Sequence, residues 1–139
     1  MTQEDKELLL KDLSARVPYD IKCKIEMWIG YDVCTIYNIN SIGFVEIVED
    51  SDTNGVNIER IKPYLFPLSS MTEEQKKYIA DRWGVNEDFD FEIDPNWGKY
   101  FVELGDVVDY VNWLNENHFD IRGLIPRGLA IDATGKGIY

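Results

Sequence analysis

The stretch that most constrains the fold is residues 105–132, because it joins an amphipathic helix to a segment that cannot be helical. Asp106 suits the N-cap of this helix, and Asp109 three positions later suits the positive end of the helix dipole. At about 100° per residue, Trp113 falls to one side of the apolar stripe. That stripe collects three apolar side chains and the only histidine of the chain: Val107, Val111, Leu114 and His118.

The segment after this helix is apolar, but its glycines and proline exclude another helix. Gly123, Pro126 and Gly128 interrupt it at short intervals. The pattern predicts one or two short extended segments over residues 123–132, bent at the proline and packed on the helix. Residues 133–139 are polar and contain two glycines, so we expect them to fray.

Two further helices are predicted from their capping residues. Thr2 and Asp5 form a capping pattern at the start of a helix over residues 2–17. Thr72 forms a capping box with the glutamine three positions later, and Gly84 suits the end of that second helix. Both helices have apolar residues at helical spacing, which favours packing against a sheet or another helix.

Short strands are predicted between the first and second helices. Apolar alternation or β-branched residues mark four segments: 20–29, 33–39, 44–49 and 56–61. In the first segment Trp28 lies opposite the apolar side, which consists of Ile21, Cys23, Ile25, Met27 and Ile29. The next segment, residues 61–68, contains Pro63 and Pro67, so we expect an extended crossing rather than a central strand. A further strand is predicted over residues 88–94 from its alternating acids.

These elements predict an α+β fold with about three helices and a curled antiparallel β-meander that could close into a small barrel. At 139 residues we expect a single domain, with a helix-and-meander half over 1–68 and a helical half over 69–139. Neither half alone would bury much core. The sequence contains no internal repeat and no low-complexity tract.

Charge and hydropathy restrict the partners. The chain has 26 acids and 14 bases, a net charge of -12, which argues against general nucleic-acid binding and against anionic membrane surfaces. No run of apolar residues is long enough for a membrane helix, and the acidic start lacks a signal-peptide pattern, so we predict a cytoplasmic protein. The acidity serves either solubility or mimicry of nucleic acid toward a basic partner.

The sequence contains no catalytic, metal-binding or cofactor-binding signature. Cys23 and Cys34 fall within predicted strands, as reduced core residues of a cytosolic protein do. His118 lies on an apolar stripe, where a histidine is more often a packed residue than a catalytic base. A zinc site would need more Cys and His ligands at close spacing, and the acidic run of residues 88–94 has Ile93 where a calcium loop needs glycine. A second acidic run, residues 49–54, is expected to bind a cation weakly at most. We therefore predict no catalytic residue, no metal and no cofactor.

Aromatic and basic residues outside the apolar faces are the candidates for partner binding. This set is Trp28, Trp113, His118, Arg122 and Arg127. The candidate acidic surface is the outer row of the last predicted strand: Asp88, Asp90, Glu92 and Asp94. We predict a non-enzymatic protein–protein interaction or regulatory module; the alternatives are an acidic decoy of a basic partner and, more weakly, a small hydrolase.

Three runs together carry a family resemblance: LLLKDLSARVPY at residues 8–19, and the longer runs at 58–79 and 105–132. The most specific parts of the two longer runs are KPYLFPLSSMT at 62–72 and FDIRGLIPRGLA at 119–130. In this combination the chain resembles small proteins of gut Bacteroides-type bacteria and of their phages and prophages. The resemblance covers most of the chain. It implies an intracellular or mobile-element context, and because that group has no established activity, it assigns no functional residue.

Overall fold

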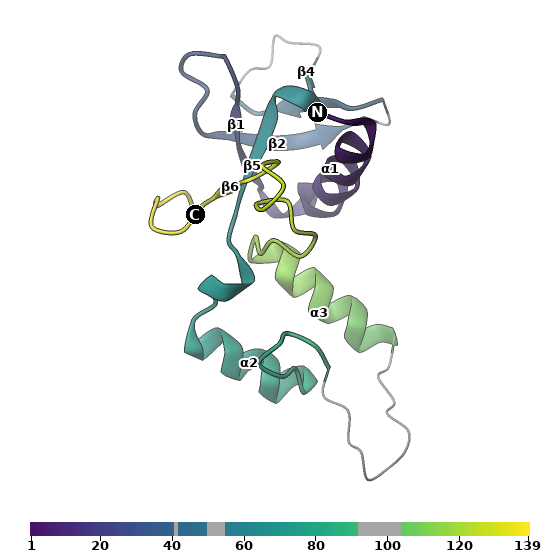
Figure 1. Ribbon diagram of the computed structural model, residues 1–139, viewed down its shortest axis with the longest axis vertical. Helices are drawn as coiled ribbons and strands as arrows, with labels where there is room; N and C mark the ends of the chain where they lie inside the picture. Colours follow the sequence, from purple (N-terminus) through teal and green to yellow (C-terminus); the bar gives the residue numbers. More distant parts are fainter. Residues whose placement is uncertain (41, 50–54, 92–103) are drawn as a thin grey trace.

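In the computed structural model, the described residues are 1–40, 42–49, 55–91 and 104–139 (Figure 1). Their helices and strands are α1 (Gln3–Arg16), β1 (Lys22–Ile25), β2 (Cys34–Ile39), β3 (Phe44–Ile47), β4 (Val56–Asn57), β5 (Ile61–Leu65), α2 (Glu73–Trp83), α3 (Leu104–Glu116) and β6 (Ile131–Asp132). Short 3-10 turns occupy Val17–Tyr19, Ile58–Arg60 and Leu68–Ser70. These elements confirm the predicted α+β class.

The described strands form one six-stranded sheet in the order β4-β3-β2-β1-β5-β6. Neighbouring strands are antiparallel, except that β6 runs parallel to β5. The first four strands therefore form the predicted meander. Within the described chain the sheet stays open, with β4 and β6 at its edges, so it is not the closed barrel that the sequence allowed.

The predicted caps of α1 and α2 form. The Thr2 hydroxyl accepts from the Asp5 backbone N–H at 3.1 Å, and the Asp5 carboxylate accepts from the Thr2 N–H at 3.4 Å. Thr72 forms the same reciprocal box at the start of α2. Gly84 ends α2 with φ +66°, a left-handed conformation that glycine adopts without steric cost.

Proline does not keep β5 out of the sheet interior, contrary to the prediction for residues 61–68. Pro63 lies opposite Cys23 in β1, while β6 covers the other side of β5. Glu26 donates its backbone N–H to the Arg60 carbonyl at 2.7 Å, and hydrogen-bonded pairs alternate along an antiparallel ladder. Pro63 therefore falls at a position that needs no N–H toward β1. On its other side, the pairing with β6 begins only at Tyr64.

Two hydrophobic clusters organise the described chain. The first lies between α1 and the sheet (Figure 1) and includes Leu9 and Leu13 of α1. Leu124 and Leu129 also belong to it, so the segment after α3 packs on the N-terminal half. The second cluster joins α2 to α3 and consists of Met71, Ile79, Val85, Tyr110, Leu114 and Phe119.

The buried face of α3 differs from the predicted stripe. The residues buried along it are Tyr110, Leu114 and Asn115, while Val107 and Val111 are only half-buried. Trp113 also packs against the second cluster. The aromatic rings of α3 pack against those of α2, so the buried face of α3 is the one that points toward α2. Asp106 lies in the first turn of α3 instead of capping it.

The segment after α3 is mostly turns, not the predicted extended hook. The Asp120 carboxylate accepts from the backbone N–H groups of Leu124 and Ile125, each at 2.9 Å, which curls the chain locally. Only Ile131–Asp132 forms a strand. The last residue is also held: the Tyr139 hydroxyl accepts from the Lys22 N–H at 3.0 Å and donates to the Tyr64 carbonyl at 2.8 Å. The predicted fraying of residues 133–139 is therefore wrong at Tyr139.

Candidate functional site

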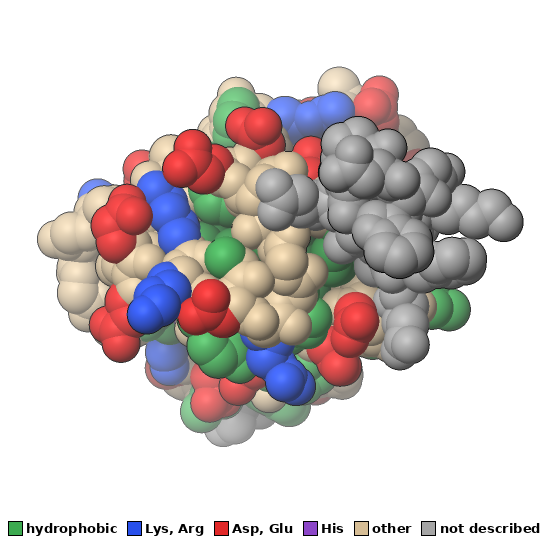
Figure 2. Space-filling model, turned by 90° about the horizontal axis from the view of Figure 1, so that it is seen from below, with side chains coloured by type: hydrophobic (Ala, Val, Ile, Leu, Met, Phe, Trp, Pro, Cys, Tyr) green, Lys and Arg blue, Asp and Glu red, His purple; other side chains and the backbone are tan. Residues whose placement is uncertain are grey.

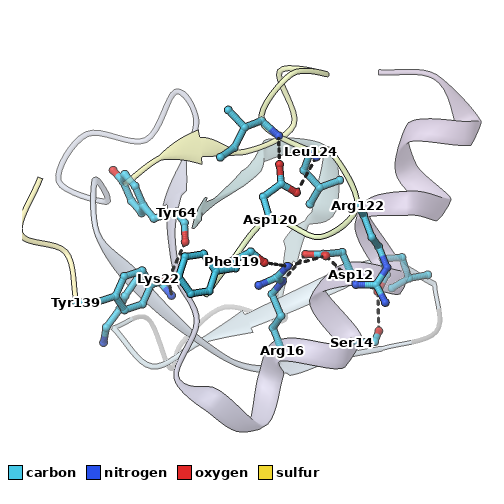
Figure 3. Close-up of polar contacts among 12 residues, drawn as sticks. Asp12, Ser14, Arg16, Lys22, Tyr64, Phe119, Asp120, Arg122, Leu124 and Tyr139 are labelled. Atoms are coloured by element: carbon cyan, nitrogen blue, oxygen red, sulfur yellow. Dashed lines mark hydrogen bonds and ion pairs between the residues drawn. The ribbon is translucent and has the colours of Figure 1, made fainter. Parts of the chain in front are cut away.

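The two predicted binding arginines bond to α1. Arg122 donates to the Asp12 carboxylate at 3.0 Å (Figure 3). Asp12 is fully buried and also accepts from Arg16 Nε at 2.7 Å and Arg16 Nη2 at 3.1 Å. Arg127 lies 3.4 Å from Asp5, in a more exposed ion pair. Both arginines thus hold the segment after α3 onto α1.

Trp28 lies in the loop of residues 26–33 that joins β1 to β2, here named the β1–β2 loop. Its ring is half-buried against the first cluster and meets the Tyr31 ring edge-on, with centroids 5.4 Å apart. Met27 and Ile29 on either side of it are 90% and 100% exposed. The predicted strand over 20–29 would have buried both, but β1 ends at Ile25, and Met27 has a left-handed φ of +68°.

The β1–β2 loop is braced by specific contacts. The Ile25 N–H donates to the Tyr31 carbonyl at 3.0 Å, which closes the loop at its base. The Tyr64 hydroxyl donates to the Asp32 carbonyl at 2.6 Å. Trp28 therefore acts as the half-buried anchor of the loop, and the loop presents Met27 and Ile29 to solvent.

A second candidate site lies where the start of α2 meets the end of α3. Two adjoining hollows, of about 460 Å³ and 220 Å³, share Gln75 and Asn117 as lining residues. We name them together the α2–α3 groove. It brings together His118, in the larger hollow, and Trp113, in the smaller one. These two predicted binding residues are close in space as well as in sequence.

His118 is a packed and neutral residue of the larger hollow. Its ring stacks on the Tyr139 ring at 3.6 Å and 13°. Burial, aided by the nearby charge of Arg16, lowers the pKa of His118 to about 4. Nδ1 is buried and has no hydrogen-bond partner among the described residues. Ser70, the neighbouring hydroxyl, donates to the Pro67 carbonyl at 2.7 Å and is not paired with the imidazole.

The smaller hollow has an aromatic wall. Tyr78 of α2 and Trp113 of α3 stack with centroids 5.6 Å apart and planes at 26°. Trp113 also stacks on Phe119 at 5.9 Å, so its ring is fixed from both sides. Tyr78 keeps 46% of its surface exposed. Glu74 adds a carboxylate, and no lysine or arginine is among the described residues that line either hollow.

The predicted acidic strand is absent where the structure describes it. Residues 87–90 form a turn, in which the Asn86 side-chain oxygen accepts from the N–H groups of Asp88 and Asp90 at 2.9 and 3.2 Å. Phe89 has a φ of +66°, which is incompatible with an extended strand. Asp88 and Asp90 are exposed, but they do not alternate along a strand face; Glu92 and Asp94 lie outside the described residues.

The described part of the chain contains no assembled site for metal binding or for a reactive thiol. Those residues contain no group of three or more His, Cys, Asp or Glu side chains placed to hold a metal ion. Cys23 and Cys34 are buried thiols that lie directly opposite each other in β1 and β2. Burial raises the pKa of the Cys23 thiol, which keeps it protonated and unreactive at neutral pH. Among the described helices, none could span a membrane.

No protein-family model, curated protein or solved structure matches this chain. The resemblance to proteins of Bacteroides-type bacteria and their phages therefore stays a prediction, and the site must be judged on its own geometry. Sequence reasoning missed Met27 and Ile29 because it placed them inside a strand. It also missed Tyr78, whose partner Trp113 is more than thirty positions away in the sequence.

Proposed function

We propose that this chain is a protein–protein interaction module and that the β1–β2 loop is its contact element. The observation that carries the proposal is the exposure of Met27 and Ile29, at 90% and 100%. Fully burying one such side chain is worth about 1.5–3 kcal/mol. Adjacent apolar side chains held out in water on a structured loop are typical of partner contacts.

The loop is prepared for binding because its backbone is already fixed. Trp28 is anchored against the first cluster, and the Tyr64 and Tyr31 contacts hold both ends of the loop. A partner would therefore order few main-chain torsions when it binds, which lowers the entropic cost of association. The left-handed φ of Met27 is a local strain that the bracing contacts maintain.

The surrounding charge indicates what kind of partner fits. Glu26 and Asp32 flank the exposed side chains, and the whole chain carries a net charge of -12. Glu26 lies 3.7 Å from Lys62, which offsets one of these charges, and Asp32 contributes the other. We expect a protein surface with an apolar pocket and a basic rim, because complementary charge speeds association and disfavours acidic partners.

The decoy alternative has weaker support. A nucleic-acid mimic needs carboxylates in rows, whereas Asp88 and Asp90 sit in a turn. On the face seen from the α2 and α3 end, acidic side chains are interspersed with lysine and arginine (Figure 2). The hydrolase alternative lacks a nucleophile paired with His118 among the described residues. These observations favour the interaction module.

The test is site-specific crosslinking followed by affinity measurement. A photoreactive residue at position 29 should capture a partner in the native host, and one at position 42 should not. Met27→Ser/Ile29→Ser should weaken binding of that purified partner at least tenfold, on the order of 1.4 kcal/mol. Ile42→Ser is the matched control, since Ile42 is 77% exposed outside the loop. Equal binding by both variants, or equal capture from both positions, would contradict the proposal.

A further inference from the structure

We infer that the α2–α3 groove is a second binding site, which takes an arginine side chain from a peptide segment of a partner. The groove lies where α2 meets α3, whereas the β1–β2 loop joins two strands of the sheet. Figure 1 shows that these helices and the sheet lie at different ends of the molecule. The inference therefore does not rest on the function proposed for the loop. It rests on three features of the groove: an exposed aromatic ring, side-chain oxygens that can accept further hydrogen bonds, and the negative charge of the residues that line it.

The aromatic surface is the Tyr78 ring. It stacks on Trp113 and meets the Trp83 ring edge-on, and the residue is still 46% exposed, so part of this aromatic side chain is accessible to a ligand. A guanidinium group binds such a surface by cation–π attraction and by planar stacking. The same aromatic cluster already holds one internal example: the Arg82 guanidinium carbon lies 5.7 Å from the centroid of the Trp83 ring.

Acceptors lie beside this surface on both helices. Glu74 is one helical turn before Tyr78, and Glu116 and Asn117 are about one turn after Trp113, so helix geometry places them toward one region. Neither glutamate forms an ion pair with any described residue. The Asn117 amide donates to the Trp113 carbonyl at 2.9 Å, which orients the side chain and leaves its oxygen as an acceptor.

The charges of the residues that line the groove favour a cationic ligand. The described lining residues of both hollows include the two glutamates and no lysine or arginine. The His118 imidazole is neutral at neutral pH, because its pKa lies at about 4, and so it does not repel a cation. The two glutamates would repel a phosphate or a carboxylate. Arginine fits better than lysine because its planar fork can stack on Tyr78 while it donates to a carboxylate.

The experiment uses capped Gly-Gly-Arg-Gly-Gly, with lysine and glutamine in place of arginine as comparison peptides, and the full chain labelled for NMR. The arginine peptide should shift the indole N–H signal of Trp113 in a saturable manner, and the glutamine peptide should bind at least tenfold more weakly. The lysine peptide should fall between them. Raising the salt concentration should weaken binding of the arginine peptide, because the carboxylates are solvent-accessible.

Two variants on one helix turn provide the matched control. Glu74→Gln should weaken arginine-peptide binding at least threefold. Glu73→Gln removes the same charge from the adjacent position, whose side chain is 92% exposed and does not line the groove, and should leave binding unchanged. Equal loss in both variants, equal binding of the glutamine peptide, or no shift at Trp113 would each overturn the inference. Saturable binding of maltose in place of the arginine peptide would also overturn it and would identify a carbohydrate site.

Discussion

Replacing Asp12 with alanine is the sharpest test of what holds the C-terminal segment to the N-terminal half. Asp12 and Arg16 are both fully buried, and Arg16 donates to both Asp12 carboxylate oxygens. Arg16 also donates to the Phe119 carbonyl at 2.6 Å, and Arg122 approaches Asp12 from the segment after α3 (Figure 3). One carboxylate thus balances two guanidinium groups from different parts of the chain.

The expected cost follows from what Asp12→Ala leaves behind. Arg16 would remain inside the protein with no opposing charge, and breaking a buried pair in this way costs about 3–5 kcal/mol. Arg122→Ala should cost less, about 1–2 kcal/mol, because Asp12 keeps its two bonds to Arg16 and the Arg122 side chain is 23% exposed. Arg127→Ala, which removes only exposed ion pairs with Asp5 and Glu4, should cost at most about 1 kcal/mol.

Urea unfolding of the three variants, followed by circular dichroism, measures these differences directly. The double variant Asp12→Leu/Arg16→Met should recover much of the loss, because an apolar pair removes the uncompensated charge. The order Asp12, Arg122, Arg127 is the prediction. If Asp12→Ala cost no more than Arg127→Ala, the buried network would not be the link between the C-terminal segment and α1.

Two further changes test the second cluster and the groove. Leu114→Ala should lower the free energy of unfolding by roughly 2–5 kcal/mol, since Leu114 is buried; an unchanged midpoint in urea would show that α3 packs by another face. Burial lowers the pKa of His118 from 6.5 to about 4, so the unfolded chain takes up the proton first as the pH falls, and stability should drop between pH 6.5 and 4. From pH 7 to pH 5 this loss is at most about 2 kcal/mol, and His118→Phe should remove it; an unaltered pH dependence in that variant would refute the packed, neutral histidine.

The start of α1 and both ends of α2 were predictable from their capping residues. Thr2, Thr72 and Gly84 act within one turn of chain, so their roles can be recognised without knowing the fold. The register of β5 could not be recognised in this way. Pro63 is tolerated only because the ladder alternation and the late start of β6 leave its missing N–H without a required partner.

Only some members of the candidate site were predictable from the sequence, and their contacts were not. Trp113 and His118 were singled out from the sequence, and the groove contains both. Arg122 was singled out as well, yet its partner Asp12 lies 110 positions away, and nothing local reveals that pairing. Tyr78 was overlooked for the same reason, because its meaning comes from a ring on another helix.

The predicted alternation of apolar residues fails in the β1–β2 loop, which is also the proposed binding element. Alternation from Ile21 to Ile29 is regular, and Ile21, Cys23 and Ile25 are buried as it predicts. The pattern then continues into Met27 and Ile29, although no described element covers them. An apolar pattern that extends beyond its own sheet destabilises the isolated protein slightly and gains nothing within the described chain. Natural sequences are locally consistent except where function opposes stability, so the uncovered end of this pattern is best explained by a partner that completes it.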